Sequence, residues 1–286
     1  MKELIVISGK GGTGKTSMVA AFASLSKDLI LCDTDVDAAD LHLIMNPKIQ
    51  EQHLFKSGNT ALLNKDKCVQ CGLCRDLCKF DAISEDYIIN SFACEGCGVC
   101  YYFCPEKAID FPENICGNWY ISKINQGLMV HARLGVGEEN SGKLVTLVRK
   151  EARNIGQDKG YNLILTDGPP GVGCPVIASI GGASAVLIVS EPTVSGKHDT
   201  ERVISLAKHF NVFAMVCVNK YDLNIEMSQE IQDFVSQKNI PYVGNIPFDP
   251  AFTKSMVNGQ NIFDYDPDLP SCNAVKDIWN NVSNYL

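Results

Sequence analysis

The sequence predicts an α/β protein whose doubly wound, mostly parallel sheet is interrupted by a small inserted α+β domain. Short apolar runs that are typical of buried strands alternate with helical patterns along most of the chain. A glycine-rich stretch follows the first of these strands. Between residues 65 and 111, eight closely spaced cysteines break the alternation. We therefore expect a main domain made of residues 1–64 and 112–286, with an insert at residues 65–111.

Composition narrows the class of protein. The 286 residues are 45% hydrophobic and their mean hydropathy is close to zero, as in soluble globular proteins. No apolar run reaches the roughly 18 residues of a membrane-spanning helix. The start of the chain has no signal-peptide pattern, so we expect a cytoplasmic protein without stable membrane insertion. The formal net charge of −8 disfavours nucleic-acid binding, which needs a basic surface. Thirteen cysteines in such a chain favour metal ligation over disulfides.

The first strand, Leu4–Ile7, leads into a phosphate-binding loop. Residues 9–16 match G-x-x-x-x-G-K-[ST] at every fixed position, and an amphipathic helix follows. Glycines let backbone N–H groups face phosphate oxygens, and the helix N-terminus adds its positive end. We expect Lys15 on the β and γ phosphates and the Thr16 hydroxyl on Mg²⁺. The expected nucleotide-binding residues here are Gly9, Lys10, Gly11, Gly12, Thr13, Gly14, Lys15, Thr16 and Ser17.

The loop carries a second lysine, Lys10. The stretch Lys-Gly-Gly-Thr-Gly-Lys-Thr at residues 10–16 resembles the deviant phosphate loop of the MinD/ParA/Mrp family of ATPases. The resemblance implies an ATP-dependent homodimer that encloses two nucleotides, in which Lys10 reaches the partner's phosphates. The spacing alone indicates only an additional cation near the phosphates, which could equally balance charge.

A second strand, Leu29–Asp33, ends in an acidic run that extends to Asp40. Carboxylates at the C-terminal ends of parallel strands lie where α/β sheets bind ligands. The resemblance implies that Asp35 orients the attacking water, which makes it a catalytic residue together with the two loop lysines. Asp37 and Asp40 are additional carboxylates that could partner Mg²⁺ or a lysine; for both, the interpretation we prefer is an acidic helix start, favoured by the helix dipole.

Another apolar strand, Tyr161–Thr166, ends at Asp167 within Asp-Gly-Pro-Pro-Gly. A hydrophobic strand that ends in aspartate is the second half of a phosphate-loop site, where the carboxylate binds Mg²⁺ directly or through water. We therefore expect Thr16 and Asp167 to hold Mg²⁺. The pentapeptide also resembles the second switch of the same family.

Later segments complete the expected main domain. The resemblance places Asn219, at the end of the strand Phe213–Val218, and Pro247 near the adenine, although a strand-end turn is an alternative for both. The last helix, about residues 274–286, has one apolar face and little basic character. That pattern favours packing on the core over attachment to a membrane.

The cysteines form two runs of identical spacing, C-x2-C-x2-C-x3-C, offset by 26 residues. They resemble a bacterial two-cluster ferredoxin, in which the fourth cysteine of each run ligates the other cluster. The resemblance implies one 4Fe–4S cluster on Cys68, Cys71, Cys74 and Cys104, and a second on Cys78, Cys94, Cys97 and Cys100. Structural zinc is the alternative that paired C-x2-C spacings allow. Clusters with a purely structural role are another.

The flanks of the insert are less regular. Residues 47–64 are polar and are interpreted as a connecting segment, whereas Trp119–Lys123 and Leu128–Leu134 predict a hairpin. A helix is expected at residues 143–155. Residues 135–142 are similar to a segment of MinD-superfamily ATPases that carry an inserted ferredoxin.

The resemblance covers nearly the whole chain. It implies ATP or ADP, Mg²⁺ and two 4Fe–4S clusters as cofactors, and ATP hydrolysis as the activity. Our hypothesis is ATP-gated electron transfer to or from a redox protein partner. An iron–sulfur assembly carrier would instead have labile, transferable clusters. A MinD-like positioning ATPase would use its clusters as a redox sensor.

Overall fold

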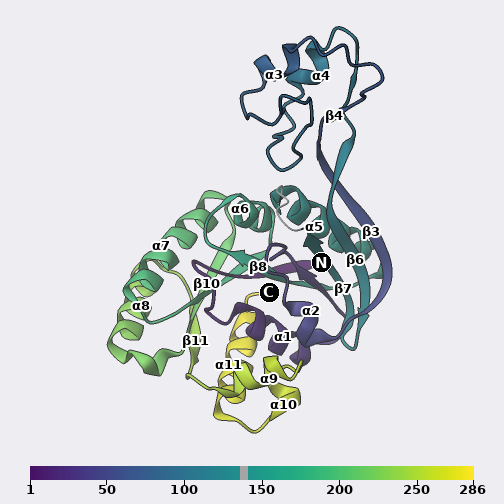
Figure 1. Ribbon diagram of the computed structural model, residues 1–286. Coiled ribbons are helices and arrows are strands. Elements are labelled where there is room, and N and C mark those ends of the chain that lie inside the picture. The colour runs from purple at the N-terminus through teal and green to yellow at the C-terminus, as the bar shows by residue number, and fades with distance from the viewer. Residues whose placement is uncertain (136–140) are drawn as a thin grey trace. The chain divides into compact units, whose positions relative to one another are not determined.

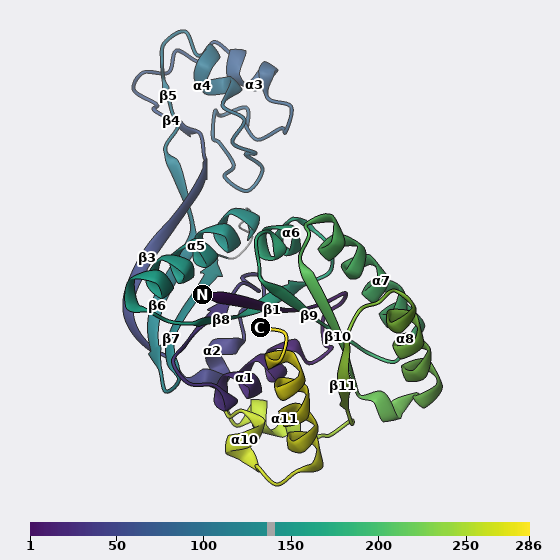
Figure 2. The ribbon, with the colours of Figure 1, turned by 180° about the vertical axis from the view of Figure 1, so that it is seen from behind.

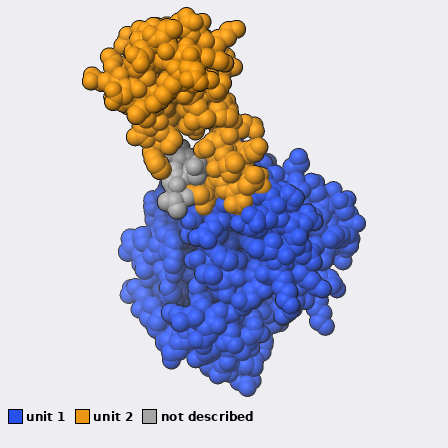
Figure 3. Space-filling model, turned by 45° about the vertical axis from the view of Figure 1, so that its right-hand side comes forward, with its two compact units in different colours: residues 1–53, 119–133, 141–286 blue, residues 54–118, 134–140 orange. Residues whose placement is uncertain are grey.

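The computed structural model describes residues 1–135 and 141–286, which form two compact units (Figures 1 and 3). Unit 1 contains residues 1–53, 119–133 and 141–286, and unit 2 contains residues 54–118 and the stretch that begins at Leu134. The predicted insert, residues 65–111, lies within unit 2. Of the segment 135–142, residues 136–140 lie outside the described residues. No helix in the described ranges is long and apolar enough to cross a membrane.

A sheet of nine strands, in the order β11-β10-β9-β1-β8-β2-β7-β6-β3, runs through the described chain. Every adjacent pair from β11 to β7 is parallel. The bounds of these seven strands are Tyr242–Ile246 (β11), Phe213–Asn219 (β10), Ala185–Ser190 (β9), Lys2–Ser8 (β1), Leu163–Pro170 (β8), Leu29–Asp33 (β2) and Gly127–Leu134 (β7). The predicted hairpin is confirmed as β6 (Glu113–Ile124) and β7, joined by two residues.

Helices cover both faces of the parallel sheet in unit 1 (Figure 2). One core lies between the strands and the helices α1 (Lys15–Leu25), α2 (Leu41–Met45), α9 (Ala251–Val257), α10 (Ile262–Tyr265) and α11 (Pro270–Ser283). A second core lies between the strands and the helices α6 (Cys174–Ile180), α7 (Val194–His209) and α8 (Ile225–Gln237). The predicted doubly wound, mostly parallel sheet is therefore confirmed.

Two predicted helices have different bounds in the structure. The helix expected at residues 143–155 is α5, Ser141–Lys159, and the last helix begins at Pro270, earlier than expected. Pro270 suits a first helical turn because its missing N–H has no partner to satisfy there. The last helix packs on the core as predicted, with its Trp279 ring 4.9 Å from that of Phe22.

Residues 47–64 lead from unit 1 into unit 2, but the sequence did not indicate that they form strands. Residues Lys48–Asn59 form a twelve-residue strand, β3, at one end of the sheet order. Most of its first half is exposed, so the sequence lacks the apolar alternation that marks a strand. Pairing with β6 holds this segment in the sheet, and only its second half contributes buried side chains, Phe55 and Ser57.

Unit 2 is built as a structural repeat. Its helices α3 (Leu73–Leu77) and α4 (Val99–Phe103) each begin directly after a glycine with positive φ, Gly72 and Gly98. A two-stranded antiparallel sheet pairs β4 (Leu62–Leu63) with β5 (Ile109–Asp110). The small core contains buried apolar side chains and cysteines from both runs.

Candidate nucleotide site and cysteine pockets

The glycine loop connects the central strand β1 to helix α1. Gly12 and Gly14 have φ angles of 79° and 89°, in a region that favours glycine. A Cβ atom on Gly14 would lie 2.5 Å from Asn219 Nδ2, so the space also demands glycine. Asn219 Nδ2 donates a 2.8 Å hydrogen bond to the Thr13 carbonyl, which ties the loop to the end of β10.

The loop forms one wall of a cavity of about 380 Å³. Nine of the predicted residues line this cavity: Gly11, Gly12, Gly14, Lys15, Thr16, Ser17, Asp35, Asn219 and Pro247. Residues of α9, which no motif indicated, complete its apolar side: Phe252, Thr253 and Met256. Four predicted residues, Gly9, Lys10, Thr13 and Asp167, do not line it. Residues that are 200 positions apart in the sequence thus meet around one space large enough for a small ligand.

Lys15 and Asp35 pair inside this cavity. Lys15 Nζ lies 3.5 Å from Asp35 Oδ2, and the lysine side chain is only 6% exposed. Burial raises the pKa of Asp35, and the charge of Lys15 opposes that rise. The two predicted catalytic groups therefore neutralise each other when no phosphate is near.

Two buried carboxylates lie beside the loop. Asp33 and Asp167 occupy paired positions on the neighbouring strands β2 and β8. Burial raises the pKa of Asp167 to about 6, against the lowering effect of Lys15, and burial with the nearby Asp167 raises that of Asp33. Within the described residues, neither oxygen of Asp167 has a hydrogen-bond partner, nor has Asp33 Oδ2. Asp33 Oδ1 accepts a 3.1 Å hydrogen bond from the Asp35 backbone N–H, which leaves three carboxylate oxygens without a donor. Such oxygens fit a hard divalent cation such as Mg²⁺, which prefers oxygen ligands.

The far wall of the cavity is anchored by residues after β10 and β11. Asp222 Oδ1 accepts a 2.6 Å hydrogen bond from the Phe248 backbone N–H. Lys220 Nζ donates to the Gly12 carbonyl at 3.1 Å. Sequence reasoning missed Lys220, Asp222 and Phe248, although their neighbours Asn219 and Pro247 were predicted.

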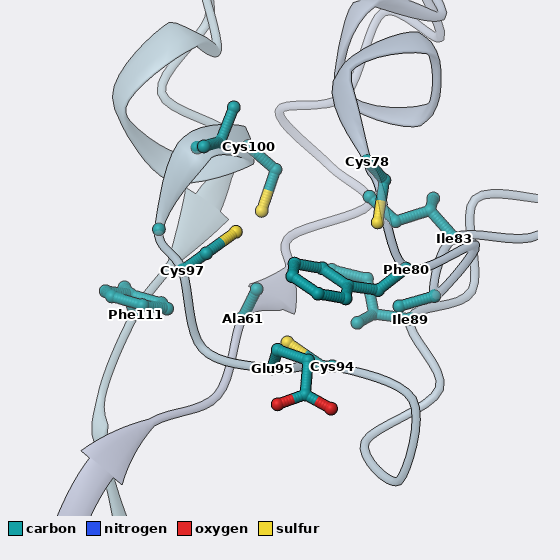
Figure 4. Close-up of a pocket in the computed structure, with 13 residues that line it drawn as sticks. Ala61, Cys78, Phe80, Ile83, Ile89, Cys94, Glu95, Cys97, Cys100 and Phe111 are labelled. Atoms are coloured by element: carbon teal, nitrogen blue, oxygen red, sulfur yellow. The ribbon is translucent and has the colours of Figure 1, made fainter.

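Unit 2 holds two separate pockets, each lined by four cysteines. Cys68, Cys71, Cys74 and Cys104 line one, with Leu63, Leu73 and Ile109 among its apolar residues. Cys78, Cys94, Cys97 and Cys100 line the other, with Phe80, Ile89 and Phe111. Figure 4 shows the sulfurs of Cys78, Cys97 and Cys100 pointing into a shared space. Each set takes three cysteines from one run and the fourth from the other.

The cysteines whose charges affect the pKa of Cys74 are the other three that line its pocket. Burial raises the pKa of the Cys74 thiol, and Cys68, Cys71 and Cys104 raise it further. Burial also raises the pKa of Cys100, with contributions from Cys94 and Cys97 of its own pocket and from Cys74 of the other. Negative charge on four thiolates in an apolar pocket is costly unless a cationic group compensates it.

Among the described residues, no group of three or more His, Cys, Asp or Glu side chains that could hold a single metal ion is found. Four cysteines around one apolar pocket are the donor set of tetrahedral zinc and of a 4Fe–4S cluster alike, so the lining residues fit either group.

The site defines a class of protein. A glycine loop between a buried parallel strand and a helix, with strand-end aspartates beside it, is the nucleotide site of a P-loop protein. A family model described as the CobQ/CobB/MinD/ParA nucleotide binding domain matches residues 4–262. The chain belongs to this family, and it is a P-loop ATPase that hydrolyses ATP.

Individual relatives agree with this assignment. The chain is 31% identical over 290 residues to an uncharacterized protein of Methanocaldococcus jannaschii, covering 99% of this chain and 97% of that protein. MinD of Pyrococcus horikoshii, solved with Mg-ADP, has a TM-score of 0.62 at 18% identity and covers 98% and 95% of the two chains. The cell-division ATPase MinD of Pyrococcus furiosus has a TM-score of 0.63 at 17% identity, with coverage of 100% and 99%. These structures share the fold of this chain.

Proposed function

We propose that the protein couples ATP binding and hydrolysis in a homodimer to two 4Fe–4S clusters in unit 2, and so gates electron transfer to or from a redox protein partner. The observation that carries this proposal is the sorting of eight cysteines into two apolar pockets of four. Four thiolates per cluster is the ligand set of a cubane, and apolar side chains line each pocket beside them.

The nucleotide step begins at Lys15. Phosphate oxygens would compete with Asp35 for the Lys15 ammonium group, because Lys15 Nζ lies 3.5 Å from Asp35 Oδ2. Once Lys15 turns to phosphate, Asp35 is free to accept a hydrogen bond from the attacking water. Thr16 and Asp167 would hold Mg²⁺, which supplies positive charge where the transferred phosphoryl group becomes most negative. Lys10 would add a second cation from the partner subunit.

Communication with unit 2 has a short path along the chain. The helix α2 follows Asp35 within six residues, and β3 begins three residues after α2. The His42 ring of α2 stacks on His131 of β7 with centroids 6.2 Å apart, and His131 stacks on Tyr120 of β6 at 5.0 Å. The strands β3 and β6 both continue into unit 2. A change at Asp35 would therefore reach every strand that leads to the cysteines.

A carrier that delivers clusters to other proteins is the second candidate. The exposure of one cysteine in each pocket, Cys71 and Cys97, favours it, because an incoming thiol could attack there. Transferable clusters would be lost rapidly to a chelator or an acceptor protein, whereas electron carriers would keep theirs through repeated reduction and oxidation.

Anaerobic purification tests the proposal. Iron analysis should give about eight irons per chain, with two interacting 4Fe–4S signals in EPR after reduction. Lys15→Ala should abolish ATP binding and leave the iron content unchanged, because the cysteines belong to a separate unit. Zinc in place of iron would refute the proposal. Iron loss in Lys15→Ala would show instead that nucleotide binding is needed to build or retain the clusters.

A further inference from the structure

Lys10, the loop lysine expected to act in trans, has a partner within its own subunit. Lys10 Nζ lies 3.1 Å from Glu191 Oε2 and 3.5 Å from Thr193 Oγ1. The other carboxylate oxygen, Glu191 Oε1, accepts a 2.5 Å hydrogen bond from Lys220 Nζ. One carboxylate, 13% exposed, therefore bridges two lysines at the rim of the nucleotide site.

The structure holds this carboxylate firmly in place. Glu191 directly follows β9, and its carbonyl accepts a 2.8 Å hydrogen bond from the N–H of Thr193, which caps α7. A Cβ on Gly196 would lie 2.3 Å from the same carbonyl, so this turn admits only glycine there. Burial raises the pKa of Glu191, but hydrogen bonds from Lys220 and Lys10 outweigh it and lower the pKa overall. The group remains a carboxylate at neutral pH.

The two lysines are not equivalent. Lys220 has a second anchor, the Gly12 carbonyl at 3.1 Å, and its backbone N–H donates to Asn219 Oδ1 at 2.9 Å. The backbone carbonyl of Lys10 accepts a 2.6 Å hydrogen bond from Ser8 Oγ, but the Lys10 ammonium group has, within the described residues, only Glu191 and the long contact to Thr193. If Lys10 leaves, Glu191 still has a full positive charge 2.5 Å away. Removing one partner of a buried pair is costly when it strands a charge, and Lys220 prevents that here.

We propose that Glu191 is a positioning residue that holds Lys10 within its own subunit and releases it at low cost, because Lys220 remains paired with Glu191 when Lys10 crosses to a second copy's nucleotide. The inference rests on the proposed dimer. It implies that the free energy of dimerisation depends partly on how strongly Glu191 holds Lys10 in the separate subunit. We call this Lys10–Glu191 contact the latch.

The latch is tested by measuring the dimer Kd in sedimentation equilibrium with Mg²⁺ and a saturating non-hydrolysable ATP analogue. Because every subunit then carries nucleotide, a change in nucleotide affinity does not alter the measured Kd. Glu191→Gln abolishes the charge that holds Lys10, so the dimer Kd should fall about 3- to 10-fold. Lys220→Gln leaves Glu191 with Lys10 as its sole cation, so the dimer Kd should rise by a similar factor. The double variant should behave like Glu191→Gln, because without the carboxylate Lys220 has nothing to compensate.

Two controls separate the latch from other effects. Lys10→Ala should abolish the dimer, and ADP binding checks that each variant is folded. If the wild type forms no nucleotide-dependent dimer, the proposed dimer fails and the latch fails with it. If the wild type dimerises but both single variants weaken the dimer, Glu191 and Lys220 merely brace the loop and only the latch is overturned. Unchanged Kd values in both would overturn it as well.

Discussion

Pairs of cysteine substitutions test whether each cluster draws its fourth ligand from the other run. The pockets group Cys68 with Cys104 and separate Cys68 from Cys78, although Cys68 and Cys78 belong to the same run. Cys68→Ala with Cys104→Ala removes two ligands from one pocket and leaves the other complete. Cys68→Ala with Cys78→Ala removes one ligand from each pocket.

The expected iron contents follow from this grouping. The first double variant should retain about four irons per chain, in one intact 4Fe–4S cluster whose EPR signal no longer shows coupling to a neighbour. The second should leave both clusters incomplete and should retain well under four irons in 4Fe–4S form. The assay is iron and sulfide analysis with EPR on anaerobically purified protein.

Cys116→Ser is the matched control, because Cys116 belongs to unit 2 but lies outside both pockets. Its Sγ donates to the Ser57 carbonyl at 3.0 Å, and a serine hydroxyl can keep that hydrogen bond. This variant should load about eight irons. If the iron contents of the two double variants were reversed, each run would bind its own cluster, and the grouping inferred from the pockets would be wrong.

Three further predictions concern unit 1. Arg149→Met removes the buried guanidinium partner of Glu3, at 2.8 and 2.9 Å, while Arg153 Nε stays bonded to Glu3 Oε2 at 2.9 Å; it should therefore lower the free energy of unfolding in urea by only about 2 kcal/mol, and a loss under about 0.5 kcal/mol would contradict the importance of the Arg149–Glu3 pair. Asp167→Asn should reduce the Mg²⁺-dependent kcat about 100-fold. It should also raise the free energy of unfolding of the nucleotide-free protein by about 1 kcal/mol, because it relieves repulsion between buried carboxylates. A loss of stability in this variant would refute that reasoning. Burial and nearby His42 lower the pKa of His131 from 6.5 to about 4. Between these pH values the unfolded chain is protonated at His131 and the native protein is not, so the free energy of unfolding falls as the pH falls from about 6.5 to 4. Between pH 7 and pH 5 this should cost about 2 kcal/mol, and His131→Asn should remove that part of the pH dependence measured by urea unfolding.

The local patterns predicted most of unit 1. Strands such as β1, whose residues Leu4–Ile7 are fully buried, are continuous apolar runs because both faces of the sheet are covered. The loop residues were identifiable because phosphate binding requires those residue types at fixed spacing, whereas Asp35 was predicted only through the family resemblance. The strand β3 was missed because its residues are mostly exposed, so hydrophobic periodicity carries no signal for it.

Long-range contacts explain what the sequence could not predict. Glu191 meets Lys10 across 181 positions, and Met256 lines the nucleotide cavity only because α9 returns to the loop. Neither residue belongs to a motif, since its partner is determined by the order of strands and not by local spacing. Similarly, the two buried carboxylates, Asp33 and Asp167, become neighbours only when β2 and β8 pair. Motifs therefore predicted which residue types bind phosphate, and the fold determined which charges oppose them.

The measurement that tests the central claim most directly is steady-state ATP hydrolysis by the fully loaded protein, with its clusters oxidised and then chemically reduced. The account predicts a several-fold change in kcat between the two states, because the strands that carry the cysteine unit pack through His131 on the helix that follows Asp35. The half-loaded Cys68→Ala, Cys104→Ala variant shows whether one cluster suffices, and Lys15→Ala gives the background rate. An unchanged kcat, with both clusters confirmed by EPR in each state, would contradict coupling between the two units.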